Sequence, residues 1–120
     1  MQKASKQVSP VLEAQFRFLE WLIPALNNFP KSQRFVLGDR IQVLAQDILE
    51  ALVEANYTRD RRGHLVRANL MLEKLRFFIR LAVEMKYMDR RRYEHAAKSI
   101  DEIGRQVGGW LKASDAPATR

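Results

Sequence analysis

Length, composition and charge limit what this chain of 120 residues can be. Its length corresponds to one domain, and a hydrophobic content of 47% is sufficient for a core. The absence of cysteine excludes disulfides, zinc-thiolate sites and iron-sulfur clusters, and it fits a reducing cytoplasm. Lysine and arginine number 21 against 14 acids, which gives a net charge of +7 and a pI near 10.1. The excess predicts a polyanionic partner, nucleic acid first, although charge that only maintains solubility would look the same.

The first ten residues, MQKASKQVSP, are polar and contain no apolar core of a signal peptide. The longest apolar runs are far shorter than the ~20 residues that a membrane-spanning helix needs. We therefore expect residues 1–8 to be frayed, a cytoplasmic location and no membrane partner.

The first predicted helix covers residues 10–27. Ser9-Pro10 favours a helix start, because serine caps the free N–H groups and proline suits the first helical position. Pro24 lies inside the pattern and predicts a kink or an early end. Trp21 and Phe18 lie off the main apolar face and would cover a second surface. The predicted core face consists of Leu12, Phe16, Leu19, Ile23 and Leu26.

The second predicted helix covers residues 32–58, with Ser32 as its N-cap. Phe29-Pro30 interrupts the chain before it, because proline removes a backbone donor and biases its neighbour away from helix. Gly38 lies one turn inside the helix, where it costs about 1 kcal/mol relative to alanine. The predicted core face consists of Leu37, Ile41, Leu44, Ile48, Leu52 and Ala55.

The third predicted helix covers residues 64–87 and follows a short basic connector, so it should run antiparallel to the second. Further apolar residues indicate that this helix is central or contacts another subunit. These are Leu70, Phe77, Phe78, Leu81 and Met85. The seam itself alternates spacings of three and four through Leu65, Ala68, Leu72, Leu75, Ile79 and Ala82.

The fourth predicted helix covers residues 89–111, with Asp89 as its N-cap. Three glycines near its end indicate a close approach to another element or a C-terminal cap: Gly104, Gly108 and Gly109. Residues 113–120 are expected to form a disordered tail. Its core face consists of Tyr93, Ala96, Ile100, Ile103, Val107 and Trp110. Residues 1–112 are thus predicted to form one all-α domain, an up-down-up-down four-helix bundle.

Catalytic motifs are absent from the sequence. His64 and His95 are 31 positions apart, and neither stands in a metal-ligand spacing such as H-E-x-x-H or Glu-x-x-His. We therefore predict a non-enzyme with no catalytic residue, no cofactor and no metal. The alternative is an enzyme with an unrecognised site, which a polar pocket with shifted pKa values would support.

Basic residues on three of the predicted helices are the candidate phosphate contacts. Arg76 and Arg80 place like charges side by side, yet Glu73 and Glu84 can reach them, so a self-neutralised face is the alternative. The arginines from 90 to 92 open a helix, where the macrodipole disfavours cations; the alternative is a solvated turn without a role. The candidates are Arg34, Arg40, Arg67, Lys74, Arg76, Arg80, Arg90, Arg91 and Arg92. They predict phosphate contacts with a strong salt dependence and no base-specific recognition.

Several stretches of the chain resemble a known family. FPKSQRFVLGDRIQ, LEALVEANY, ANLMLEKLRFFIRLA and RRYEHAAKSIDEIGRQVGGWLK are similar to the accessory variability protein (Avd) of diversity-generating retroelements, over roughly residues 15–112. That family lies within the wider group of four-helix ribosomal-RNA intervening-sequence proteins. The wider group shares mainly the P-x-S-x-R-x-x-L-G-x-R-I core, whereas the EANY, LEKLR and EIGRQVGGWLK stretches favour the Avd subgroup.

The resemblance implies a four-helix protomer that assembles as a basic homopentameric barrel. It also implies partners: the reverse transcriptase of the same retroelement and its template-repeat RNA, or DNA. In that family the complex supports mutagenic cDNA synthesis, and the polymerase chemistry belongs to the reverse transcriptase. The alternative is a structural, protein-binding bundle of the intervening-sequence group, in which the charge is incidental.

Overall fold

Four long helices form the fold in a computed structural model that describes residues 8–115. In chain order the elements are α1 (Pro10–Leu26), α2 (Lys31–Gln33), the π-helical segment η2 (Arg34–Gly38), α3 (Asp39–Asn56), α4 (Arg62–Glu84) and α5 (Arg90–Asp115). No strand occurs within these residues, which confirms the predicted all-α class. Residues 1–7 and 116–120, which include most of the predicted frayed segment and tail, lie outside the described residues.

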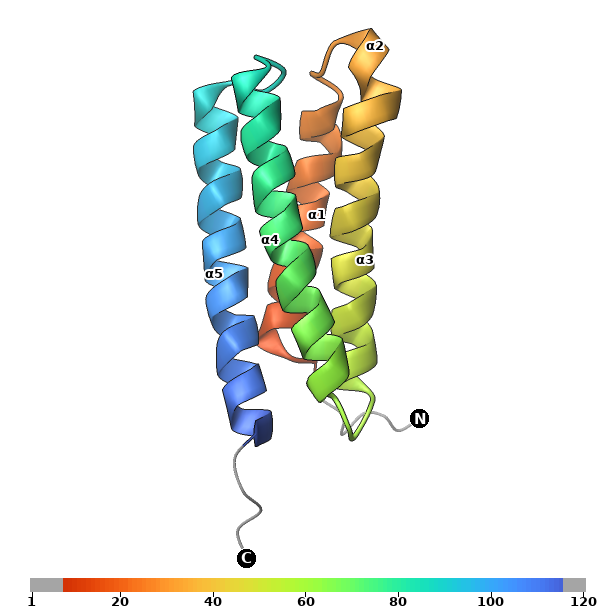
Figure 1. Cartoon of the computed structure of the whole chain (residues 1–120), viewed down its shortest axis with the longest axis vertical. Helices are drawn as coiled ribbons and strands as arrows, with labels where there is room; N and C mark the ends of the chain where they lie inside the picture. The colour runs from red at the N-terminus through yellow and green to blue at the C-terminus, as the bar shows by residue number, and fades with distance from the viewer. Residues whose placement is uncertain (1–7, 116–120) are drawn as a thin grey trace, which may run out of the picture.

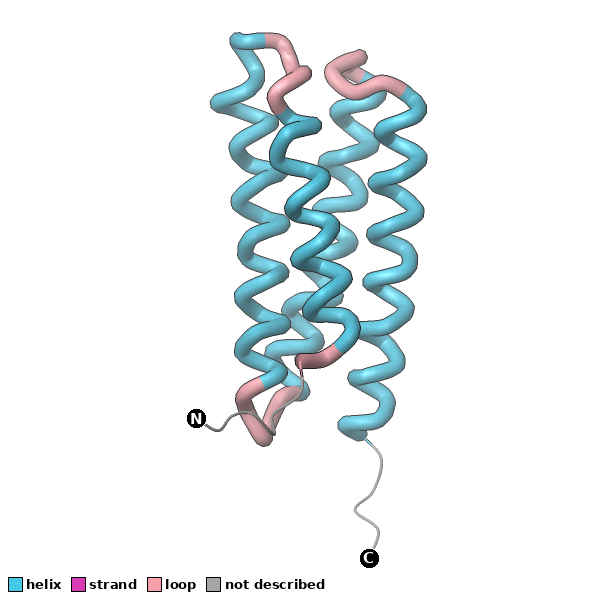
Figure 2. Tube along the Cα trace, turned by 180° about the vertical axis from the view of Figure 1, so that it is seen from behind, coloured by secondary structure: helices cyan, strands magenta, loops and turns pink. Residues whose placement is uncertain are grey.

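The long helices lie side by side and alternate in direction (Figure 1). α1 packs against α3 and α5, and α4 packs against the same two helices, so α1 and α4 occupy opposite corners. The connectors after α1 and α4 lie at one end, called the α2 end here, and the connector after α3 lies at the other (Figure 2). This arrangement matches the predicted four-helix bundle. None of the helices within residues 8–115 is long and apolar enough to cross a membrane.

The start of α1 agrees with the sequence. The Ser9 Oγ accepts a hydrogen bond from the Val11 N–H at 3.3 Å, and α1 begins at Pro10. Pro24 remains inside the helix, which ends two residues later at Leu26 in tight turns: the Asn27 N–H donates to the Pro24 carbonyl at 3.1 Å. The helix therefore runs through Pro24 and ends one residue before the predicted end at 27, so the early end expected at this proline is not seen, and the alternative of a kink stays a prediction.

The predicted core face of α1 was partly wrong. Phe16 and Ile23 are exposed, whereas Gln15, Phe18 and Leu22 are buried. The helix is rotated relative to the prediction because a polar residue, Gln15, takes a core position, where its Nε2 donates to the Ala45 carbonyl at 2.9 Å. A glutamine at that position hides the true apolar face from a pattern of hydrophobic residues alone.

The start of the second helix also differs from the prediction. Helix α2 begins at Lys31 after Pro30, so Ser32 lies inside the first turn and is not the N-cap. The chain then widens into the π-helical segment η2 before α3 continues. Leu37 is half-buried, and the rest of the predicted face, from Ile41 to Ala55, is buried as expected. The buried Gly38 adopts ordinary helical angles, φ −59° and ψ −45°.

Helix α4 buries its predicted seam, every residue of which is in the core. The helix stands at a corner of the bundle, so the alternative that it is central was wrong. Phe78 is half-buried, whereas Leu70, Phe77, Leu81 and Met85 are exposed on the outer side. The other alternative, a contact with another subunit, stays a prediction.

Helix α4 ends at Glu84, earlier than predicted, in a turn that satisfies its last carbonyls. The Tyr87 N–H donates to the Ala82 carbonyl at 2.8 Å, and the Lys86 N–H donates to the Val83 carbonyl at 2.9 Å. These two bonds form a Schellman motif, whose C′ residue takes the left-handed conformation. Lys86 occupies that position with φ 65°, the only positive φ of a non-glycine residue among the described residues.

Helix α5 begins with the predicted cap. The Arg92 N–H donates to Asp89 Oδ1 at 2.8 Å, and the predicted core face is buried or half-buried throughout. The helix continues to Asp115, beyond the predicted end at 111. A Cβ at Gly104, Gly108 or Gly109 would meet no atom within 4 Å, so these glycines serve neither a close approach within the described chain nor a C-terminal cap. They remain helical because each costs only about 1 kcal/mol.

Candidate nucleic-acid interface

Six of the nine predicted phosphate contacts gather at the α2 end of the bundle. Two of them lie in η2 and the first turn of α3, one lies in the last turns of α4, and three lie in the first turn of α5. These elements meet at the α2 end (Figure 1). They are Arg34, Arg40, Arg80, Arg90, Arg91 and Arg92. Arg67, Lys74 and Arg76 lie further along α4. The fold thus brings together basic residues from separate parts of the sequence.

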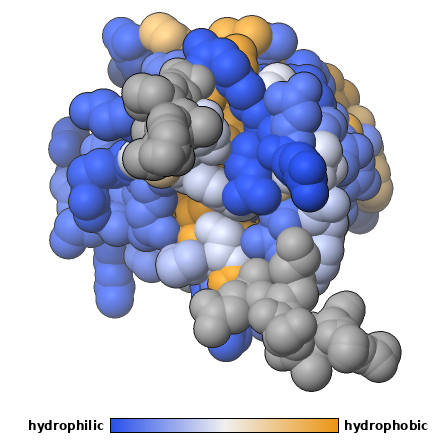
Figure 3. Space-filling model, turned by 90° about the horizontal axis from the view of Figure 1, so that it is seen from below, coloured by the Kyte–Doolittle hydropathy of each residue, from blue (hydrophilic) through white to orange (hydrophobic). Residues whose placement is uncertain are grey.

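The opposite end of the molecule is seen along the bundle axis in Figure 3. Its surface is mostly hydrophilic, with hydrophobic surface visible between the helices and along part of the rim. The α3–α4 connector contributes Arg59 and Arg61 there, and the Arg61 guanidinium lies 5.4 Å from the centre of the Trp110 ring. The cation–π contact with Trp110 therefore already engages Arg61 at that end.

Four of the nine candidates are held by acids of the chain. Arg67 donates to Glu54 at 2.7 Å, Arg92 pairs with Asp89 at 2.6 Å, and Arg90 lies 3.9 Å from Glu94. Arg76 binds Asp101 across the α4–α5 contact and lies 3.5 Å from Glu73. The self-neutralised alternative therefore describes Arg76, where Glu73 makes the expected contact.

The pKa of Arg76 reflects this double pairing. Burial by itself would lower the pKa, but the hydrogen bond to Asp101 and the nearby charge of Glu73 raise it above its ordinary value. The guanidinium therefore stabilises the packing of α4 against α5. A residue bound on two sides within its own fold has less capacity to bind phosphate.

The other candidates have no ion-pair partner among the described residues. Lys74, Arg80 and Arg91 are exposed, and Arg34 is half-buried with its Nε lacking a hydrogen-bond partner. Arg40 lies over the Phe78 ring at 5.3 Å, and it forms no ion pair with its sequence neighbour Asp39. Glu84 does not hold Arg80 either. These five residues present the uncompensated charge, and their contact with RNA stays a prediction.

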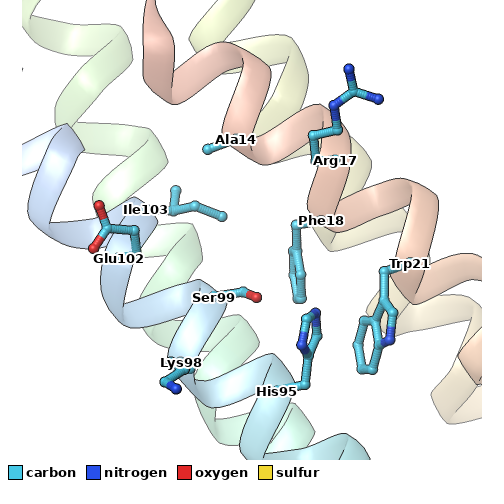
Figure 4. A pocket seen from close by; sticks show the side chains of 9 residues that line it. All are labelled: Ala14, Arg17, Phe18, Trp21, His95, Lys98, Ser99, Glu102 and Ile103. Carbon is cyan, nitrogen blue, oxygen red and sulfur yellow. The ribbon is translucent and has the colours of Figure 1, made fainter.

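Sequence reasoning missed a groove between α1 and α5. The groove has a volume of about 680 Å³ and is lined by residues of both helices. Its walls include Phe18 and Trp21 from α1, and His95 and Lys98 from α5 (Figure 4). The off-face position of Trp21 was the one available signal, since nothing in the periodicity says which helices are neighbours.

The groove carries one perturbed carboxyl. Hydrogen bonds from Arg105 and Gln106 hold the pKa of Glu102 below its usual range. Glu102 therefore already accepts hydrogen bonds from side chains of its own helix. Among the residues that the structure describes, no group of three or more histidines and acids has the arrangement of a metal site.

Comparison with known proteins identifies the family of this chain. No curated protein matches the chain. The family model described as bAvd-like matches residues 10–114, which is nearly all of the described bundle. The match includes the basic α2 end and both walls of the α1–α5 groove. The chain therefore belongs to the bAvd-like family.

Proposed function

We propose that this chain is a non-catalytic accessory protein of a diversity-generating retroelement. It binds the reverse transcriptase of that element and its template RNA in the cytoplasm and supports mutagenic cDNA synthesis. Membership of the bAvd-like family is the observation that carries the proposal. The net charge of +7 supports it. When a basic surface neutralises phosphates, the counterions of the nucleic acid are released into solution, and this release favours binding.

The uncompensated cations are the proposed RNA contacts. Lys74, Arg80 and Arg91 are exposed and have no acidic partner in the described chain. An ion-paired arginine such as Arg67 would first have to break its bond to Glu54. On this proposal, the unpaired residues contribute most of the RNA affinity and the paired residues contribute least; the ion pairs support this order.

Self-association is the second part of the proposal. Val66, Leu70, Phe77 and Leu81 recur at spacings of four, seven and four on the outer side of α4, and all are at least 44% exposed. Such an exposed apolar ridge is typical of a protein interface. We assign it to contacts between copies in a homopentamer, whose mass would be 5 × 14.0 = 70 kDa.

Fluorescence anisotropy with a labelled single-stranded RNA across a salt series tests the RNA contacts. The Arg80→Ala and Arg91→Ala variants should each weaken binding and reduce the salt slope by up to about 0.7. Arg67→Ala is the matched control and should bind nearly as well as the unchanged protein. Equal losses in all three would contradict the ranking, and a wild-type chain indifferent to RNA would leave a protein-binding bundle.

Light scattering coupled to size exclusion tests the assembly. We expect a species near 5 × 14.0 = 70 kDa, and Phe77→Glu should shift it toward the protomer. Glu in place of the exposed Val53 on α3 is the control, since that residue lies off the α4 ridge. A wild-type monomer would refute the assembly proposal.

A further inference from the structure

Three aromatic rings line the groove between α1 and α5. The Trp21 and His95 ring centres lie 4.3 Å apart at an interplanar angle of 42°, and Phe18 stacks on Trp21 at 6.0 Å and 18° (Figure 4). Phe18 is buried and fixes the position of the indole, whereas Trp21 is half-buried and His95 is exposed. Part of a firmly held aromatic surface is therefore open to a ligand.

The groove continues beyond Trp21 and His95 into a second hollow. These two rings line both spaces, and the second also includes Asp89, Arg91 and Arg92. Together the two hollows form one path along the α1 side of α5, with the aromatic pair at its middle. A ligand longer than one aromatic group can therefore follow the path on either side of the rings.

Two unpaired cations flank the rings along this path. Arg91 and Lys98 are seven positions apart on α5, on either side of His95, and thus share one helix face about 10 Å apart. Both are exposed, and neither has an ion-pair partner among the described residues. The acids nearby already have partners, because Asp89 holds Arg92 and Glu102 accepts bonds from its own helix. The uncompensated charge at the groove is positive.

We propose that this groove binds single-stranded RNA by stacking one unpaired base on Trp21 and His95. Lys98 and Arg91 bind phosphates on either side of that base. Aromatic platforms with flanking cations favour single strands of any sequence, because every base has a π-face and in a duplex that face is covered. The inference rests on the proposed function and names the place and the manner in which RNA is held. Two unpaired cations beside the rings complement phosphates, whereas a second copy of the chain carries a net charge of +7 itself.

Binding of a short fluorescein-labelled oligouridine RNA to the full chain tests the inference. Trp21→Ala should weaken binding about 5- to 150-fold, which is the effect of losing one base-stacking contact. Trp21→Phe should restore most of the affinity, since a ring remains. Phe16→Ala removes an exposed aromatic of α1 that lines neither hollow and is the matched control, with no loss expected. A blunt-ended RNA duplex, which has no unpaired base, should bind the wild-type chain and Trp21→Ala equally well.

A second readout reports the stacking itself. The chain has two tryptophans, so Trp110→Phe leaves Trp21 as the only indole. Its fluorescence should be quenched as oligouridine binds. Lys98→Glu changes an exposed side chain and should weaken RNA binding more than 10-fold while the helical circular dichroism is retained. If Trp21→Ala fails to fold, the RNA affinity of Lys98→Glu shows whether the groove is the RNA site.

The outcomes separate this inference from the function on which it rests. If wild-type chain binds oligouridine and neither Trp21→Ala nor Lys98→Glu weakens it, the groove is not the RNA site, while the accessory function stands. If Trp21→Ala instead changes the mass in light scattering and leaves RNA affinity intact, the groove is a subunit contact and the inference is overturned. If the wild-type chain binds no RNA, the RNA-binding part of the proposed function falls as well.

Discussion

Replacing Lys86 by glycine tests whether the protein keeps a cation at this position at the expense of its folding stability. The residue occupies the C′ position of the α4 Schellman motif with φ 65°, a conformation that costs an L-residue about 1–2 kcal/mol. Lys86→Gly removes that cost, and the greater freedom of glycine in the unfolded chain returns about 0.5–1 kcal/mol of it. We expect a net stabilisation of about 0.5–1 kcal/mol, or a melting temperature higher by roughly 2–4 °C.

Urea denaturation at a fixed protein concentration measures this effect, with Lys86→Ala as the matched control. Alanine removes the charge but keeps the Cβ that makes the conformation costly, so its stability should stay near that of wild type. Both variants should lose RNA affinity to a similar degree, because Lys86 is an exposed cation at the α2 end. If Lys86→Gly is no more stable than Lys86→Ala, the backbone cost assigned to this turn is wrong.

Three further changes test individual parts of the fold. Gly38→Ala should stabilise the chain by about 0.4–1 kcal/mol in urea denaturation, because its angles are helical and the nearest atom would lie 3.5 Å from the new Cβ; a loss would mean that η2 requires glycine. Asp89→Ala should cost about 0.5–2 kcal/mol through loss of the α5 cap to Arg92, while Asp89→Asn should cost little. Arg105→Ala should raise the pKa of Glu102 toward its ordinary value in a carbon-detected NMR titration. Since the folded pKa of Glu102 is lowered, its contribution to stability is present above the ordinary carboxyl pKa and is lost as the pH falls through the folded value.

The helices that bury one regular stripe could be predicted from the sequence. The α4 seam from Leu65 to Ala82 is buried residue for residue, because its three-four spacing describes a single face of a helix at a bundle corner. Helix α1 could not be oriented in this way, since the buried Gln15 interrupts its stripe and the exposed Phe16 and Ile23 form a competing one. A polar residue is acceptable in that core because its side chain finds a carbonyl on α3.

Whether a candidate cation is paired with an acid depends in part on which helices are neighbours. The contact of Arg90 with Glu94 lies within one helix and follows from a spacing of four. The bond between Arg76 and Asp101 joins residues 25 positions apart, and only the packing of α4 against α5 reveals it. The Trp21–His95 contact of the groove likewise joins the first and last helices. Periodicity within a helix predicts its buried face but carries no information on the element that covers the opposite side.

The positions of the two proposed surfaces argue that they work at the same time. Helix α4 carries the exposed apolar ridge and stands at the corner opposite α1, whose wall forms one side of the groove. A subunit docked on the outer side of α4 therefore leaves the aromatic rings and cations of the α1–α5 face accessible to RNA. Substitutions at Phe77 and at Trp21 share no contact, so their effects on assembly and on RNA affinity should be independent and additive in free energy. An assembly held together by the α1–α5 face would couple the two effects, because each copy would then cover the groove of its neighbour.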